Sequence, residues 1–537
     1  MEPDADDLLL FARRGLDRRG RRDERHGGLL DAADQALALA IANRPQPPLV
    51  KKQLRFHDER QVKIATEKVY RKLDDSVVMF SSSAWNSVTV SQFYPPDRGL
   101  YRFRIRARGF QSAEKPVTYR IDAGPMLMGT RNHLVGYFDA APENASVTEF
   151  TDHLEARSTI RISPYGLANA QTVDKIGAET YSGPGLAVEW VEVEGPLHET
   201  WPPECHRRLF GDLPQKKAPV YNQSDRVEVV SENPVKDARE ILTRFLGLAF
   251  RRTINRADVD PFVAIVESRL AEGYSFEQSV RVALKGVLVS PGFLFLREVP
   301  GRLDDEALAS RLSYFLWSTM PDEELRQSAV TGKLHEPTVL VAQVERMLNH
   351  PKSKALTENF VGQWLKLRDL DFTEPDHLLY PEFDDLLKAA MLQESHRFFE
   401  EVLKQDLSLT NFVASDFSML NERLARHYGI SGVEGHAIRK VMLPPDSHRG
   451  GVLTMASVLK VTANGTTTSP VLRGVWIMER MLGYRTAPAR FRPGHRGGAG
   501  GGDRGSQARH QGDAQAHATP LGGGGRRRRP GRLLRDH

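Results

Sequence analysis

Residues 303–325 read LDDEALASRLSYFLWSTMPDEEL, the clearest local folding pattern in the chain. Apolar residues recur at helical spacing behind an acidic pair that suits the positive end of a helix dipole; they are Leu308, Leu312, Phe315 and Leu316, behind Asp304 and Asp305. The pattern predicts a buried helix. Pro321 interrupts it, and Thr319 stands three residues before Asp322, the spacing of a cap that opens a second helix.

The same helical period continues on both sides of this stretch. The predicted helices and apolar stripes are Ala238–Phe250, Asp258–Leu270, a helix opened by Ser275 and Gln278, Thr338–Leu348, the stripe Leu356, Phe360, Trp364 and Leu367, and the stripe from Phe383 to Val402. Such stripes are typical of a core rather than of a cofactor site. We therefore predict an all-α part, divided into a small helical domain (235–300), a helical bundle (301–432) and an incomplete helical and loop domain (433–485).

Ahead of it, the hydrophobic period is two. Tyr101, Phe103, Ile105 and Ala107 alternate with arginines, which indicates a strand with one buried and one solvated face. Further strand candidates are Ser87–Phe93, Val117–Ala123, Ser146–Phe150, Ser158–Ser163 and Leu186–Val193. Many short strands without long helices between them predict an antiparallel β-sandwich or jelly roll over residues 46–200, after a short helix (28–45) and before a linker (201–234).

The two ends of the chain have a different composition. Residues 486–537 contain eleven Arg against three Asp, so a formal charge of +5 for the whole chain leaves −3 for the rest. This segment lacks apolar periodicity and is predicted to be disordered. We favour an out-of-frame reading of a GC-rich gene, which residues 1–27 suggest more mildly, over an arginine-rich RNA-binding tail. A nucleic-acid partner for the folded part is not favoured.

Cys205 is the only cysteine, which excludes an intramolecular disulfide, a four-cysteine zinc site and a Cys-x-x-Cys-His haem attachment. We expect no cofactor and no metal in this chain. No apolar run reaches the length of a membrane span, and no export signal is visible.

The strand rhythm of GLYRFRIRARG (99–109), TIRISPYG (159–166) and GPGLAVEWVEVEG (183–195) resembles that of galactose-binding-like and family-six-type carbohydrate-binding modules. Exposed aromatic rings stack on the apolar face of a sugar, and the candidates are Trp85, Tyr94, Tyr165 and Trp190. The alternative places Trp85 and Trp190 in the sandwich core. Asp97, Asp122 and Glu189 offer oxygens to a structural calcium ion, or else are ordinary surface carboxylates.

The helical part resembles a planctomycete-type multidomain family, the domain-of-unknown-function 1595/1592/1588 group. The segments that carry the resemblance include RFLGLAFRRTINRADVD, LASRLSYFLWSTMPDEEL, ENFVGQWLKLRDL and RGGVLTMASVLKVTANGTTTSPVLRGVWIMERMLG. The resemblance implies an exported or periplasmic protein, often accompanied by cytochrome c-like segments, so a cytochrome-like partner is an expectation. It also implies that this chain is truncated at both ends.

Few residues of the helical part suggest chemistry. Glu394, His396 and Glu400 lie within two turns of one predicted helix, as a weak catalytic or metal-binding candidate or as a surface ion pair. Arg473 follows the loop TTTSPVL and is predicted either to hold an anion or to tie the loop together.

We therefore interpret the chain as a binding or scaffold protein of unknown molecular function, associated with the cell envelope or with polysaccharide use. The alternative is a redox or hydrolytic enzyme component whose haem-bearing part is missing. The hydrolytic version predicts that Glu394 and His396 face a shared pocket.

Overall fold

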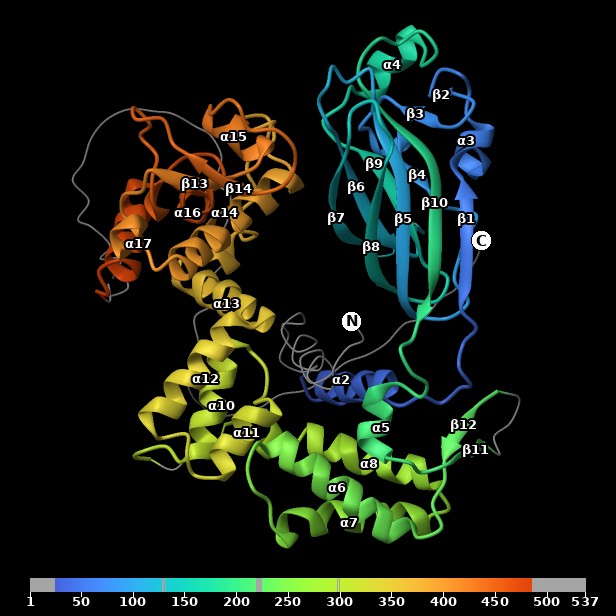
Figure 1. Cartoon of the computed structure of the whole chain (residues 1–537), viewed down its shortest axis with the longest axis vertical. Coiled ribbons are helices and arrows are strands. Elements are labelled where there is room, and N and C mark those ends of the chain that lie inside the picture. The colour runs from blue at the N-terminus through green and yellow to red at the C-terminus, as the bar shows by residue number, and fades with distance from the viewer. Residues whose placement is uncertain are drawn as a thin grey trace, which may run out of the picture. The chain divides into compact units, whose positions relative to one another are not determined.

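The computed structural model describes residues 25–484, apart from residues 128, 129, 131, 219–224, 297 and 299. Along this part a β-sandwich precedes a series of helices, which confirms the predicted fold class (Figure 1). The predictions for residues 1–24 and 486–537 lie outside the described residues, whereas residues 25–27 already belong to the first described helix. None of the described helices combines the length and the apolar content needed to cross a membrane.

Two antiparallel sheets form the sandwich. The larger sheet has the order β2-β3-β10-β5-β8 with β1 also paired to β10, and its strands are β1 (Val50–Arg55), β2 (Tyr70–Lys72), β3 (Val77–Met79), β5 (Gly99–Phe110), β8 (Ser146–Leu154) and β10 (Gly185–Leu197). The smaller sheet has the order β4-β9-β6-β7, with β4 (Val88–Thr89), β6 (Val117–Gly124), β7 (His133–Ala140) and β9 (Thr159–Pro164). Two short helices lie in the connections, α3 (Arg60–Ile64) and α4 (Ala170–Ile176).

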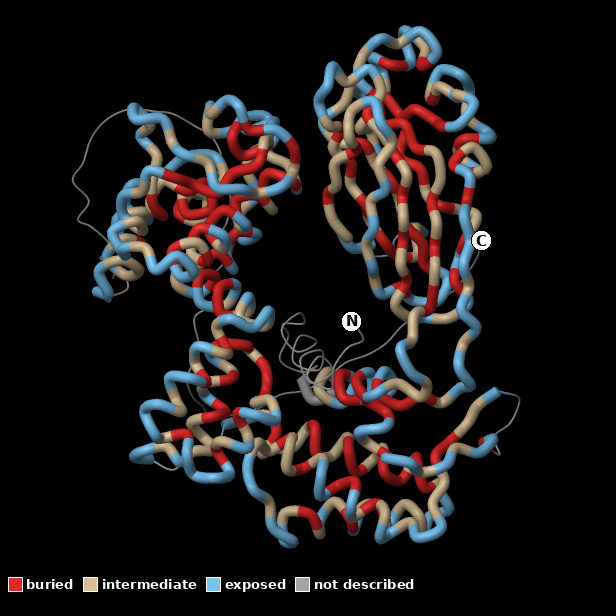
Figure 2. Tube along the Cα trace, in the orientation of Figure 1, coloured by how far each residue is buried: buried red, intermediate tan, exposed pale blue. Residues whose placement is uncertain are grey.

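The alternation predicted around Tyr101 is present along β5. Its apolar residues lie in a core shared by both sheets, and buried segments run along the strands in Figure 2. On the other face, Arg102 pairs with Glu194 (3.3 Å) and Arg106 with Glu189 (2.7 Å), while Arg104 bridges Glu149 and Glu192. This face is therefore a ladder of mutually compensated charges rather than an unbalanced basic surface.

Four strands of the sandwich were not predicted from the sequence: β1, β2, β3 and β7. β1 reads VKKQLR and lies at a sheet edge, where only Leu54 is buried, so it carries no alternating apolar pattern. In β7, buried and exposed residues do not alternate regularly, because its pairing with β6 is irregular between Ile121 and Asp122. β2 and β3 have three residues each, which is too short for a periodic signal.

The sandwich is inserted into a helical unit. α2 (Arg25–Ala40) precedes the sandwich and α5 (Glu204–Phe210) follows it, yet Leu37 and Phe210 belong to one hydrophobic core. That core also contains α6 (Pro234–Phe250), α7 (Arg256–Ala271), α8 (Phe276–Leu288) and α9 (Pro291–Leu294). Val50 pairs with Gly195, so the chain enters and leaves the sandwich at the same end. Residues 201–234 are thus no simple linker: besides α5 they form the hairpin β11 (Gln215–Lys217) and β12 (Val227–Val229).

The remaining helices form further cores. One contains α10 (Asp305–Leu316), α11 (Glu323–Val330), α12 (Pro337–Asn349) and the start of α13 (Lys354–Trp364). The others contain α14 (Asp385–Lys404), α15 (Glu422–Tyr428), α16 (Ala456–Val461) and α17 (Pro470–Arg480). A two-stranded sheet, β13 (Phe417–Leu420) with β14 (Arg439–Met442), interrupts the all-α pattern that we had predicted for this part.

The helix predicted at residues 303–325 is present as α10, with two corrections. Phe315 is 58% exposed rather than buried. The cap of α11 is Asp322, whose side chain accepts the backbone N–H of Leu325, and not Thr319. Asp322 occupies the cap position, and its carboxylate also binds Arg346, as described below.

Candidate functional site: an exposed tryptophan turn and a buried carboxyl cluster

Trp85 lies on a single 3₁₀ turn, Ala84–Asn86, between β3 and β4. Its side chain is 88% exposed, so the alternative that placed it in the sandwich core is wrong. Large aromatic side chains are usually at least half covered in a folded domain. An indole held almost entirely in solvent therefore requires an explanation.

The backbone of this turn is held firmly. Ser82 binds the neighbouring connection twice, because its N–H donates to Ala168 (3.0 Å) and its hydroxyl accepts the N–H of Leu167 (2.8 Å). Further bonds join Ala170 N–H to Ser83 Oγ, Asn86 N–H to the Ser83 carbonyl, and the Gln61 side chain to the Ser87 carbonyl. The exposure of the indole is thus imposed by an ordered turn.

The residue that follows Trp85 in the sequence carries a buried amide. Asn86 is only 5% exposed, and within the described part of the chain its Nδ2 atom has no hydrogen-bond partner. A buried donor without a partner costs about 1–3 kcal/mol. A bridging water at this position would remove that cost.

The other aromatic candidates lie elsewhere. Trp85 precedes β4, whereas Tyr94 follows that strand, five residues beyond its last residue, Thr89. Tyr165 packs edge-to-face against Tyr137 at 5.6 Å and is half-buried. Trp190 is half-buried on β10 opposite Arg106. The structure therefore does not gather the four rings into one platform.

The carboxylates considered for calcium are each paired with an arginine: Asp122 with Arg120 at 2.8 Å, Glu189 with Arg106 at 2.7 Å and Asp97 with Arg44 at 3.9 Å. Among the residues that the structure describes, no group of three or more His, Cys, Asp or Glu side chains is arranged to hold a metal ion.

Glu394 and His396 do not share a pocket. Two residues apart on α14, they point to nearly opposite faces of the helix. Glu394 bonds to residues of β13 and α15, whereas His396 faces charges that include Glu358 of α13. Burial lowers the pKa of His396, and its Nε2 atom has no hydrogen-bond partner among the described residues. Glu400 pairs instead with Arg397 at 2.8 Å.

Glu394 is the centre of a buried polar cluster. The Ser418 hydroxyl donates to one carboxyl oxygen (2.7 Å) and the Tyr428 hydroxyl to the other (2.6 Å). The Tyr428 oxygen in turn accepts the backbone N–H of Ala456 (2.7 Å), and the Arg449 guanidinium lies 3.6 Å from the centre of the Tyr428 ring. The cluster ties α14, β13, α15 and α16 together.

Burial raises the pKa of Glu394 to about 7, and the hydrogen bonds from Tyr428 and Ser418 lower it only in part. Burial and the neighbouring Glu394 carboxylate also raise the pKa of Tyr428 well above its ordinary value. The Glu394 carboxyl is 1% exposed. It can exchange a proton near neutral pH, yet it cannot touch a substrate in this conformation, so the cluster is a structural element.

The sequence analysis singled out Glu394 but not its partners Ser418, Arg449 and Ala456. They lie 24 to 62 residues away along the chain. No local spacing signals such a meeting, because tertiary packing alone brings these segments together.

Arg473 lies in the first turns of α17. Its Nη2 donates to Thr468 (3.0 Å) and its Nε to Thr462 (3.3 Å), while Ser469 caps the helix through the N–H of Leu472. Of the two arrangements considered from the sequence, the structure has the one in which arginine ties the loop together.

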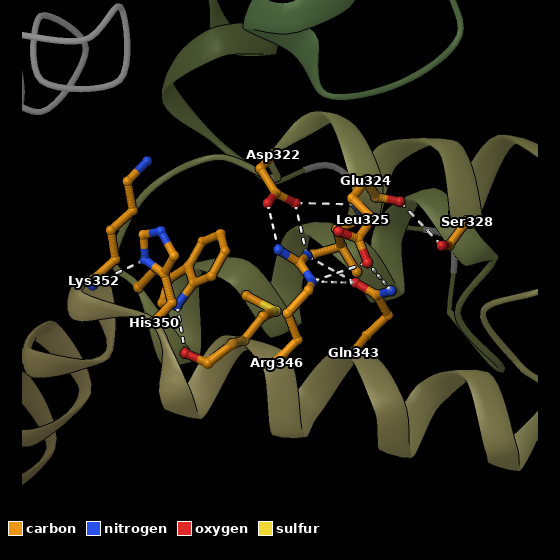
Figure 3. A network of polar contacts seen from close by, with 10 residues as sticks. Asp322, Glu324, Leu325, Ser328, Gln343, Arg346, His350 and Lys352 are labelled. Carbon is orange, nitrogen blue, oxygen red and sulfur yellow. Dashed lines mark hydrogen bonds and ion pairs between the residues drawn. The ribbon is translucent and has the colours of Figure 1, made fainter.

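A second polar network joins the stretch 303–325 to α12 and the turn after it (Figure 3). The Asp322 carboxylate faces the Arg346 guanidinium and accepts two hydrogen bonds from it, at 2.7 and 3.0 Å. Arg346 and Lys352 lie 5.4 and 5.7 Å from the ring of the buried Trp317, whose Nε1 donates to the Met347 carbonyl. All of these groups are engaged with one another, which indicates a structural role.

The comparisons with known proteins identify the helical part. Residues 237–298, 303–430 and 449–511 match, in tandem, models each described as a protein of unknown function: DUF1595, DUF1592 and DUF1588. Three models of one tandem-domain group thus match the helical part of the chain, as the resemblance noted in the sequence implied. The network of Asp322, Arg346 and Trp317 lies within the DUF1592 segment. The Glu394 cluster joins the DUF1592 segment to the DUF1588 segment through Ala456.

None of the curated proteins compared with the chain matches it. Solved structures similar to this chain include the C-terminal CBM6 of LamC, a laminarinase of Zobellia galactanivorans (11% identity, TM-score 0.19, 27% of this chain and 100% of that one). A carbohydrate-binding module of Cellvibrio mixtus lichenase 5A, in complex with cellotriose, is also similar (12% identity, TM-score 0.16, 27% of this chain and 96% of that one).

Proposed function

We propose that this protein binds polysaccharide through the Trp85 turn of its β-sandwich and acts in the cell envelope or in polysaccharide use. The observation that carries the proposal is an indole exposed by 88% on a turn that is hydrogen-bonded on both sides. A flat aromatic face complements the apolar face of a pyranose ring.

The held turn favours binding because the backbone that carries the ring loses little conformational entropy when a sugar stacks on it. A single ring gives weak binding to one sugar, so we expect a soluble polymer, with many sites along each chain, to be retained better than a short oligosaccharide.

The test is affinity electrophoresis of the full chain in gels that contain laminarin, xylan, hydroxyethylcellulose or dextran. The wild type is expected to be retarded by at least one of these polymers. Trp85→Ala should weaken that binding about tenfold or more, since it removes the stacking surface.

Tyr94→Ala is the matched control, an exposed aromatic residue that follows β4 in the sequence, and it should leave the retardation unchanged. Circular dichroism confirms that each variant is folded. A folded wild type that passes all four gels unretarded would refute the proposal, as would equal retardation of the Trp85→Ala variant.

A further inference from the structure

A second exposed surface lies in the helical part, on the loop of residues 371–383. Phe372 is 88% exposed, Leu378 93% and Leu379 59%. Much further along the chain, α17 exposes Val471 by 76% and Leu472 by 52%. Contiguous exposed apolar side chains of this size mark interaction surfaces in soluble proteins.

The loop is not exposed for lack of order. The Lys460 ammonium donates to the Thr373 carbonyl (2.7 Å), Asp376 N–H donates to the Gly465 carbonyl (3.0 Å), and the Tyr380 hydroxyl donates to the Thr466 carbonyl (3.1 Å). These bonds join the loop to residues 460–466, the segment that leads into α17.

Gly465 shows how close this approach is. Its φ is +93°, and a Cβ atom there would lie 2.6 Å from the carbonyl oxygen of Glu374. Only glycine fits both the backbone conformation and the space. The loop thus presents its apolar side chains from a fixed backbone.

The same loop is strongly acidic. Between residues 369 and 385 the chain has seven carboxylates and no Lys or Arg. Asp369, Glu374 and Glu382 are exposed. Asp371, Asp384 and Asp385 pair with Lys388, Arg423 and Arg120. The exposed Asp369, Glu374 and Glu382 leave negative charge beside the apolar side chains, which favours a partner of positive charge.

We propose that this acidic apolar surface, formed by residues 371–383 and the start of α17, binds a basic amphipathic segment of another protein. Apolar side chains of the partner cover Phe372, Leu378 and Val471, and its Lys or Arg residues face Glu374 and Glu382. A membrane fits the surface less well, because anionic lipid headgroups repel carboxylates. A second copy fits less well too, since a two-fold contact would place like charges opposite each other.

The test is a fluorescence anisotropy titration of the full chain with a labelled amphipathic helix of Lys and Leu. The matched probe is the same peptide with every Lys replaced by Glu. We expect the Lys peptide to bind, the Glu peptide not to bind, and the affinity to fall as salt is raised.

The double variant Phe372→Ser, Leu378→Ser should weaken binding of the Lys peptide about tenfold or more, and Glu374→Gln with Glu382→Gln should reduce its salt dependence. Ile64→Ser with Leu409→Ser, two apolar residues exposed by 74% and 76% elsewhere, is the control and should change nothing. Equal binding by the double variant overturns the proposal. The proposal is also overturned if light scattering shows a dimer, or if the protein floats with phosphatidylglycerol vesicles, and the double variant abolishes that dimer or that flotation.

Discussion

Trp317→Ala is expected to lower the free energy of unfolding of the α10–α13 unit by roughly 3–5 kcal/mol. The side chain is 3% exposed and packs in the core formed by α10, α11 and α12. The substitution also leaves the Met347 carbonyl without its indole donor and removes the ring that faces the charges of Arg346 and Lys352. A cavity, a lost hydrogen bond and lost cation–π contacts act in the same direction.

Urea denaturation followed by circular dichroism measures this effect. Trp85→Ala serves as the matched control, because it removes the same side chain from a position that is 88% exposed, and its effect should stay within about 0.5 kcal/mol. If the two substitutions cost the same, Trp317 is not the structural centre that the network of Figure 3 indicates.

Glu394→Gln is expected to change how stability depends on pH. The folded-state pKa of about 7 lies above the ordinary value of 4.5, so the folded protein holds this proton more tightly than the unfolded chain does. The stability that the proton confers is complete below about pH 4.5, falls as the pH rises toward 7, and is lost above it. At about 1.4 kcal/mol per pKa unit, the total loss is roughly 3 kcal/mol.

Glutamine keeps the shape and stays neutral. Its amide oxygen can accept from Tyr428 and its amide nitrogen can donate to Ser418, so the cluster remains bonded. The variant should therefore gain stability relative to the wild type between about pH 5 and pH 8, by up to roughly 3 kcal/mol.

Urea unfolding at several pH values measures this difference. Glu401→Gln, on the same helix, replaces a carboxylate that pairs with Lys440 at 2.9 Å on the surface, and it should not reproduce the trend. A difference between Glu394→Gln and the wild type that is constant across the pH range would show that Glu394 does not titrate in this way.

The regular elements could be predicted because their signals are local. Tyr101, Phe103 and Ile105 alternate with arginines, and a strand with one buried face follows from that alone. The helical spacing of Leu308, Leu312 and Leu316 likewise indicated α10. β1 gave no such signal, because an edge strand buries little and retains charged residues.

The candidate sites were predicted less completely. Trp85 was named from its residue type alone, with a buried and an exposed position both open, because the exposure of a side chain depends on what the rest of the fold places over it. For Glu394, the sequence suggested a partner on the same helix. Helix geometry turns His396 away, and β13 and α15 supply Ser418 and Tyr428 instead.

The sequence by itself determined the two kinds of secondary structure, their order and the likeness to a tandem-domain group, since each is encoded in residues close together along the chain. Only the tertiary structure decided that the sandwich is inserted into a helical unit, with Leu37 and Phe210 in one core, and which polar groups meet around Glu394. Contacts between distant segments arise when apolar faces are buried together, and no short stretch of sequence specifies its partner.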